Sequence, residues 1–380
     1  MKQIAHIIIN KIADDNYVVN NTLTNKYVRL GLRETNFLLE LLGEEQEAGD
    51  EDEVILSIRQ LEELKERFDE WGFLGERAES KKKKDFSDIT LLSIHPEGKI
   101  SKVLNKTKVL ISPIGFALLI LSIAYIVYAY TFEGEAILDG LSRLRFNAKS
   151  LIAVYFISFL SSIIHELSHA SACYKYSGKC GRMGIKLFYL IPAYFCDVSN
   201  IYMVSGKKKA FTVASAGVIS SHIFGAIVLF IYNRLYHLGT YSNICMLFYL
   251  YNLTSIVFNI IPFAKFDGYW MIKAITGIDN LYDKSILLFV QMLLDTKGYI
   301  KVIVKSRKKI AITLYGLFLF VFHWGLWGYG IFGMYYFVEK YMPGIKIITL
   351  FAMGSIGIIN GVKFTMYYIS MYRKQKRRLA

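Results

Sequence analysis

The chain has 380 residues, of which 54% are hydrophobic and 15% aromatic, shares well above those of an ordinary soluble domain. We therefore predict an integral membrane protein with a polar part attached. The formal net charge of +14 would suggest nucleic acid as the partner of a soluble protein. Here the basic residues flank apolar segments, so a cytosolic membrane face explains them and no nucleic-acid partner is expected.

Residues 1–75 are predicted to form a small α+β domain. Short β-prone runs occupy 7–12, 17–20 and 26–30, with turn residues between them. A helix is predicted over 35–42, closed by Gly43, and apolar residues at helical spacing predict another over 54–71.

This order of elements resembles the winged-helix peptide-recognition element of ribosomal-peptide modification systems. The resemblance rests on Tyr17-Val18-Val19, Tyr27-Val28-Arg29-Leu30, Phe37-Leu38-Leu39 and Trp71-Gly72-Phe73-Leu74. It implies a winged-helix-like cytosolic domain that binds a leader peptide by adding it as a strand to a sheet edge. The alternative is a small cytosolic domain of unrelated function.

A polar, basic linker over 76–108, which includes Lys81–Lys84, is expected to lead into the membrane part. A helix that crosses a bilayer needs about 20 apolar residues. Six such segments are predicted near 109–132, 149–172, 210–232, 244–262, 310–335 and 346–369. Basic residues concentrate before the first, after the second and fourth, and after the last, which places both termini in the cytosol. The expected fold class is a polytopic α-helical membrane protein embedded in the lipid bilayer.

The second apolar segment contains His165-Glu166-Leu167-Ser168-His169 near its end. Residues four apart share one face of a helix, so both imidazoles can reach one zinc ion, with Glu166 beside them as candidate general base. An ionisable side chain at membrane depth costs about 2.5–3.5 kcal/mol, so three within five residues indicate a functional site. The alternative is an interfacial helix end where these side chains meet water.

Two histidines leave room for a third protein ligand, and Asp267 is the candidate. The fourth apolar segment ends on the same predicted side of the membrane as His169. Pro262 breaks that helix, and Gly268 allows the chain to turn so that the carboxylate points inward. Asn259, just before the break, is a candidate substrate-binding amide, with an interhelical hydrogen bond as the alternative.

Other residues receive weaker assignments. Asp197 is predicted to be a loop carboxylate, with metal ligation as the alternative, and His222 and His323 are predicted to be hydrogen-bonded interior histidines. The four cysteines show no close pair and are predicted to be free thiols. A minor alternative is metal ligation by Cys173, Cys180 and Cys196.

The histidine motif, the segment Asn259…Pro262…Asp267-Gly268 and the topology that joins them resemble the site-2 protease family of intramembrane zinc metalloproteases. The resemblance covers about residues 109–290. It implies that zinc is bound by His165, His169 and Asp267, and that Glu166 is the catalytic base. Residues 291–380 are expected to add transmembrane helices and a basic cytosolic tail.

Residues 190–199 and 267–270 look like the peptide zinc metalloprotease branch of that family, which often accompanies bacteriocin-like systems. This resemblance implies a bacterial cell membrane. The chain departs from the family in the third apolar segment, where many relatives have a Gly-Pro and an Asn. It reads Ala216-Gly217-Val218-Ile219-Ser220-Ser221 there, so substrate handling is expected to differ.

The expected activity is that of a zinc-dependent intramembrane metalloendopeptidase, opening toward the cytosol. The expected substrate is a small hydrophobic or membrane-associated peptide precursor in ribosomal-peptide or bacteriocin-like maturation. Regulated cleavage of a membrane-bound signalling protein is one alternative. Another is a non-proteolytic peptide-binding accessory of an exporter or immunity system, against which the intact Glu166 argues.

Overall fold

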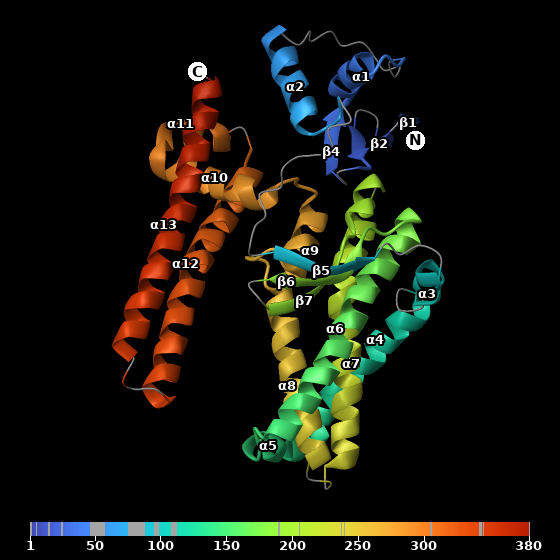
Figure 1. Cartoon of the computed structure of the whole chain (residues 1–380), viewed down its shortest axis with the longest axis vertical. Coiled ribbons are helices and arrows are strands. Elements are labelled where there is room, and N and C mark those ends of the chain that lie inside the picture. Colours follow the sequence, from blue (N-terminus) through green and yellow to red (C-terminus); the bar gives the residue numbers. More distant parts are fainter. Residues whose placement is uncertain are drawn as a thin grey trace. The chain divides into compact units, whose positions relative to one another are not determined.

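The chain is described by a computed structural model that covers residues 2–4, 6–13, 16–23, 26–45, 58–74, 88–94, 99–107, 112–188, 191–204, 206–236, 238, 240–304, 306–341, 344 and 346–379. The chain divides into two compact units, Met1–Asn259 and Ile260–Ala380. Figure 1 follows it from the blue N-terminus to the red C-terminus.

The N-terminal part of the first unit is a four-stranded antiparallel sheet with two helices. Its elements are β1 (Lys2–Ile4), β2 (Ile7–Ala13), β3 (Asn16–Asn21), β4 (Lys26–Gly31), α1 (Leu32–Leu41) and α2 (Ile58–Glu70), and the strands pair in chain order. Side chains of a strand alternate between the two faces of its sheet, and one face packs here against the helices. The buried core contains Ile7, Ile9, Tyr17, Val19, Leu30, Leu38, Leu39, Phe68 and Phe73. The three predicted strands and both predicted helices are present, and β1 is an addition.

A second sheet of three antiparallel strands packs against the helix that carries the histidine motif. It consists of β5 (Asp88–Ile94), β6 (Met183–Phe188) and β7 (Ile191–Cys196), in that order. Strand β5 and the helix α3 (Lys99–Thr107) both lie in the range 76–108, where the sequence predicts a linker. Lys81–Lys84 lie outside the described residues.

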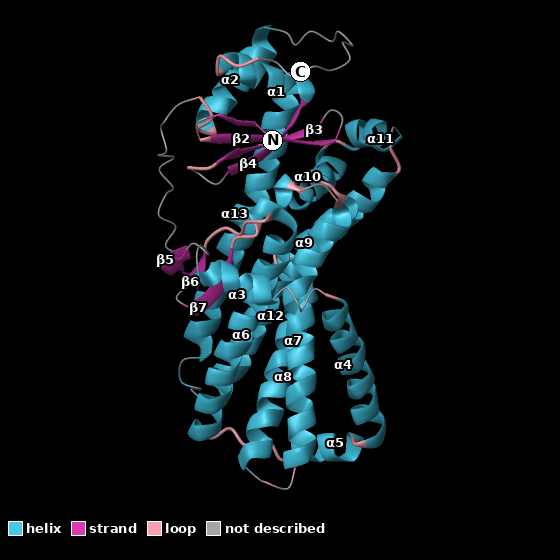
Figure 2. Cartoon of the chain, turned by 90° about the vertical axis from the view of Figure 1, so that its right-hand side faces the viewer, coloured by secondary structure: helices cyan, strands magenta, loops and turns pink. Residues whose placement is uncertain are grey.

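Four long apolar helices form the body of the first unit. They are α4 (Pro113–Phe132), α6 (Ala148–Ser177), α7 (Lys207–Leu235) and α8 (Thr240–Ile260), with the short α5 (Gly134–Ser142) between α4 and α6. Helix α7 packs against both α4 and α6 (Figure 2). Since 61% of its most apolar stretch is buried, against 17% for each of those two neighbours, α7 is the central helix of this unit. A 3-10 helix, Ser199–Met203, precedes it.

The second unit contains helices joined by turns, and its described part has no strand. Its helices are α9 (Asp267–Thr276), α10 (Leu281–Leu294), α11 (Thr296–Val304), α12 (Lys308–Tyr341) and α13 (Lys346–Leu379). Helix α10 packs against α12 and α13. Their shared core contains Ile286, Val290, Leu319, Tyr368 and Tyr372.

Six helices in the described part of the chain are long and apolar enough to cross a membrane, namely α4, α6, α7, α8, α12 and α13. They coincide with the six predicted segments. The expected combination of about six such helices with a small part containing strands is confirmed.

Candidate metal centre

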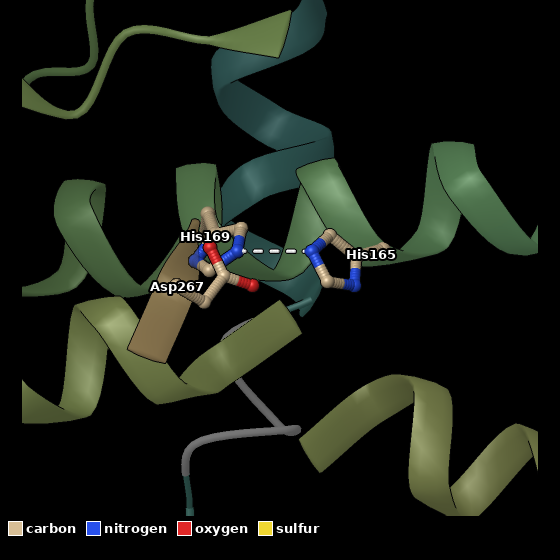
Figure 3. Close-up of side chains that lie close together, drawn as sticks. All are labelled: His165, His169 and Asp267. Carbon is tan, nitrogen blue, oxygen red and sulfur yellow. Dashed lines mark hydrogen bonds between the residues drawn. The ribbon is translucent and has the colours of Figure 1, made fainter. Parts of the chain in front are cut away.

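Helix α6 carries the predicted motif toward its C-terminal end. The helix begins at the N-cap Asn147, whose side chain accepts a hydrogen bond from the Ser150 backbone N–H (2.9 Å), and ends at Gly178, which adopts a left-handed conformation (φ 71°). Between these caps His165 and His169 lie one turn apart. Their Nε2 atoms are 3.2 Å apart (Figure 3), so the two imidazoles approach one point as the helical spacing predicts.

The other ring nitrogens of both histidines are held by helix α7. His169 Nδ1 lies 2.7 Å from the Val213 carbonyl oxygen, and His165 Nδ1 lies 2.9 Å from Ser221 Oγ. A carbonyl oxygen only accepts hydrogen bonds, so His169 Nδ1 carries the proton. The lone pair of neutral His169 is therefore on Nε2, which faces His165. Partners of this kind fix the tautomer and ring orientation of histidines that bind metals.

Gly217 of α7 makes room for the two imidazoles. A Cβ atom at this position would lie 2.5 Å from His165 Nε2 and closer still to His169 Nε2, whereas ordinary contacts of a Cβ begin near 3.4 Å. The two helices can bring the ring nitrogens together only because residue 217 has no side chain.

The geometry of the histidine pair fits a metal ion. Two nitrogens bound to one tetrahedral zinc ion at 2.0–2.1 Å lie about 3.3–3.4 Å apart. The Nε2 atoms of His165 and His169 are 3.2 Å apart. The spacing of the two nitrogens is therefore close to that of two imidazoles bound to one ion.

Asp267 is the first residue of α9 and follows the break after α8. The glycine after it, Gly268, packs so closely on the Ile260 carbonyl oxygen that a Cβ has no room, which accounts for glycine at this turn. One ligand atom from each of His165, His169 and Asp267 lies within 4.8 Å of the others (Figure 3). No second group of this kind occurs among the described residues. Two imidazoles and a carboxylate suit zinc, but they also suit other divalent transition metals.

The remaining predicted site residues lie nearby in the chain. Glu166 is half-buried on α6, directly after the first histidine. Asn259 is half-buried in the last turn of α8. Its role in substrate binding stays a prediction.

Asp197 acts as the predicted loop carboxylate, because its Oδ1 accepts a hydrogen bond from the Ser199 backbone N–H (2.9 Å). All four cysteines are free thiols, as predicted. Cys180 Sγ and Cys196 Sγ lie 3.5 Å apart. The hydrogen bond with Cys173 lowers the pKa of Cys180, but the hydrogen bond with Cys196 and burial outweigh it, so the pKa is raised and the thiol is protonated at neutral pH.

The prediction that His222 and His323 are hydrogen-bonded is wrong for their Nε2 atoms. Both atoms are buried without a hydrogen-bond partner in the described part of the chain. The His323 ring instead stacks on Phe364, with centroids 3.8 Å apart and planes 11° from parallel. Aromatic packing has taken the place of a polar contact there.

Sequence reasoning missed the residues that hold the histidines. Val213, Gly217 and Ser221 recur every four positions and so share one face of α7. They supply a carbonyl acceptor, space and a hydroxyl group. Asn252 of α8, which is buried, donates from Nδ2 to the Ser221 carbonyl oxygen (2.9 Å) and ties that part of α7 to α8. The small Gly217 and the polar Ser221, four residues apart in an apolar segment, were the sequence signal that could have indicated this face of α7.

Comparisons of the chain with models of protein families, with curated proteins and with solved structures found no match.

Proposed function

We propose that this chain is a membrane-embedded zinc metalloprotease, an intramembrane metalloendopeptidase. The observation that carries the proposal is the pair of Nε2 atoms 3.2 Å apart, next to Glu166, in a helix long and apolar enough to cross a membrane. His165, His169 and Asp267 hold the zinc ion. The proximity of the three ligand atoms, within 4.8 Å, supports this assignment.

Each residue of the site has a role in peptide hydrolysis. A bound zinc ion supplies a water of lowered pKa and polarises the scissile carbonyl group. Glu166 accepts a proton from the attacking water and returns it to the leaving amine nitrogen. Ser221 and the Val213 carbonyl hold the two imidazoles so that both Nε2 atoms face one point. Asn259 holds the backbone of the substrate at the end of α8.

The protein is a multi-pass protein of a bacterial cell membrane, with both termini and the opening of the active site in the cytosol. The six apolar helices support a multi-pass topology. The orientation rests on the basic residues, which concentrate in alternate connections and after α13.

The substrate is a small hydrophobic or membrane-associated peptide precursor, matured in a ribosomal-peptide or bacteriocin-like system. The N-terminal domain binds its leader and raises the local substrate concentration. Two contacts support this arrangement, because they join the domain to the 3-10 helix that precedes α7. Asn10 Nδ2 donates to the Met203 carbonyl oxygen (2.6 Å), and the Tyr27 hydroxyl donates to Asn200 Oδ1 (2.8 Å).

Glu166→Gln tests the proposal. The full chain, purified in detergent and loaded with zinc, is incubated with a proteome-derived peptide library, and new peptide termini are identified by mass spectrometry. We expect the native chain to generate new termini, and Glu166→Gln to bind as much zinc and generate none. Identical termini from both proteins would show that the cleavage comes from a contaminant and would refute the proposal.

The two alternatives make different predictions for the same variant. Cleavage of a membrane-bound signalling protein also needs Glu166, so the identity of the cut protein in the native host separates it from precursor maturation. A peptide-binding accessory of an exporter or immunity system does not need the base. Biological output that survives Glu166→Gln would therefore favour the accessory.

A further inference from the structure

A cavity of about 450 Å³ lies in the first unit at the end of the helices away from the histidine motif. Its lining residues belong to α5, to the connection between α5 and α6, and to the adjoining ends of α7 and α8. Figure 2 shows α5 beside these ends of α7 and α8. His165 is 17 residues beyond Ala148, the first residue of α6, which corresponds to about 25 Å along the helix. The cavity is therefore separate from the metal centre.

The cavity carries an excess of positive charge. Arg143 and Arg145 both line it, while Asp139 is the one carboxylate among its lining residues. Arg143 Nε lies 2.7 Å from Asp139 Oδ1, and the Tyr236 hydroxyl also donates to this carboxylate. Within the described part of the chain no carboxylate pairs with the Arg145 guanidinium. Arg145 therefore supplies the positive charge that is not balanced locally.

The backbone of Arg145 is fixed in place. Its N–H donates to Asn243 Oδ1 (2.9 Å), and its carbonyl oxygen accepts from Asn243 Nδ2 (3.0 Å). The same Nδ2 donates to the hydroxyl of Ser150, which is fully buried (3.0 Å). These bonds tie the connection before α6 to the first turn of α8. A cationic side chain on a fixed backbone loses less entropy when it binds a ligand.

The position of the cavity identifies the class of ligand. All four long apolar helices of the unit begin or end at this level, where the hydrocarbon of a bilayer gives way to headgroups. Leu138 and Phe146, on either side of the arginines in the chain, are 67% and 72% exposed. Guanidinium groups bind phosphate through paired hydrogen bonds, and apolar side chains beside them suit acyl chains.

We propose that this cavity binds the phosphate group of an anionic phospholipid, with Arg145 as its principal cation. The proposal rests on the apolar helices being membrane spans and is independent of peptidase activity. The lipid fastens the end of the four-helix body opposite to the metal centre.

Phosphatidylglycerol is titrated into the detergent-purified full chain, and bound lipid is counted by native mass spectrometry. Phosphatidylcholine and inorganic phosphate are titrated in parallel. We expect one phosphatidylglycerol to bind more tightly than phosphatidylcholine, and inorganic phosphate to compete only weakly. Arg145→Gln should weaken phosphatidylglycerol binding by about tenfold or more, because charge-assisted hydrogen bonds are lost. The affinity of Arg145→Lys should lie between those of the native chain and Arg145→Gln, since lysine keeps the charge without the planar guanidinium group.

Lys149→Gln is the matched control, because this exposed lysine lies four residues further on and does not line the cavity. It should leave lipid binding unchanged. Equal losses of lipid affinity in Lys149→Gln and Arg145→Gln would show that only the general surface charge matters, and would overturn the proposal. Displacement of the lipid by inorganic phosphate at similar concentration would identify a free-anion site and would overturn it too. The zinc content of Arg145→Gln should equal that of the native chain, which separates this test from that of the peptidase.

Discussion

Gly217→Ala is the most direct test of the proposed metal centre, because it adds one methyl group between the two proposed histidine ligands. The new Cβ would lie 2.5 Å from His165 Nε2 and closer to His169 Nε2, while ordinary contacts begin at 3.4 Å. The difference requires a movement of about 0.9 Å or more. Metal–ligand distances tolerate only about 0.2 Å. At least one imidazole must therefore leave the coordination geometry.

We expect Gly217→Ala to weaken zinc binding by at least about 100-fold, equivalent to about 2.7 kcal/mol. Competition with a chromophoric zinc chelator, using the detergent-purified full chain, measures this change. Alanine is a better helix former than glycine by about 1 kcal/mol, so the helicity of α7 should not fall. Circular dichroism of the metal-free protein checks that point.

Gly361→Ala is the matched control. A Cβ there would lie 2.5 Å from the Trp324 ring, so the variant also crowds an apolar helix, but without touching a histidine. It should bind zinc as the native chain does. If Gly217→Ala kept native affinity and stoichiometry, the two Nε2 atoms could not be the ligands, and the assignment of the centre would fail.

Three further results are expected. Ser221→Ala removes the hydrogen-bond partner of His165 and should weaken zinc binding by about 10–100-fold. Ser220→Ala should leave zinc binding unchanged, because the Ser220 hydroxyl bonds within α7. Equal zinc affinities of the two variants would show that Ser221 does not support the site. Chelation of zinc should lower the unfolding temperature of the native chain, because zinc at about 100 times its dissociation constant adds about 2.7 kcal/mol to the free energy of unfolding. An unchanged unfolding temperature would mean that no metal was bound. The hydrogen bond from Lys376 is the main cause that lowers the pKa of Asp295 to about 2 from 3.8. The charged carboxylate is favoured in the folded state, so its contribution to folding stability is complete above pH 3.8 and is lost as the pH falls from 3.8 to about 2. The unfolding temperature of Asp295→Asn should therefore depend less on pH in that window than that of the native chain.

The local sequence was sufficient to predict the elements that depend on short-range periodicity. The pairing of His165 with His169 follows from a helical repeat of 3.6 residues and needs no tertiary information. The same holds for the apolar spans, since length and hydropathy determine them. Helix α6 continues to Ser177, five residues beyond the predicted segment, because no helix breaker occurs before Gly178.

Features that depend on packing between distant segments were not predicted. Strand β5, whose sequence is Asp-Ile-Thr-Leu-Leu-Ser-Ile, forms by pairing with β6, far along the chain. The prediction of a continuous linker over 76–108 overlooked this short apolar run. The buried amide of Asn252 was not predicted either. The sequence directs attention to Asn259 because Pro262 follows it, whereas Asn252 is the buried residue with a hydrogen bond to α7. Only the position of α7 distinguishes the two amides.

The proposed metal centre depends on α7 as well as on the pentapeptide of α6. Gly217 stands at the middle of a stripe on α7, with Val213 and Ser221 four residues away on either side. The later histidine, His169, bonds to Val213, and the earlier, His165, bonds to Ser221, as two antiparallel helices require. On an isolated α6 both rings could rotate freely, and metal binding would have to offset that lost entropy. The stripe of Val213, Gly217 and Ser221 orients both rings before a metal ion binds. A chain with the same pentapeptide but without this stripe is therefore not expected to bind zinc with comparable affinity.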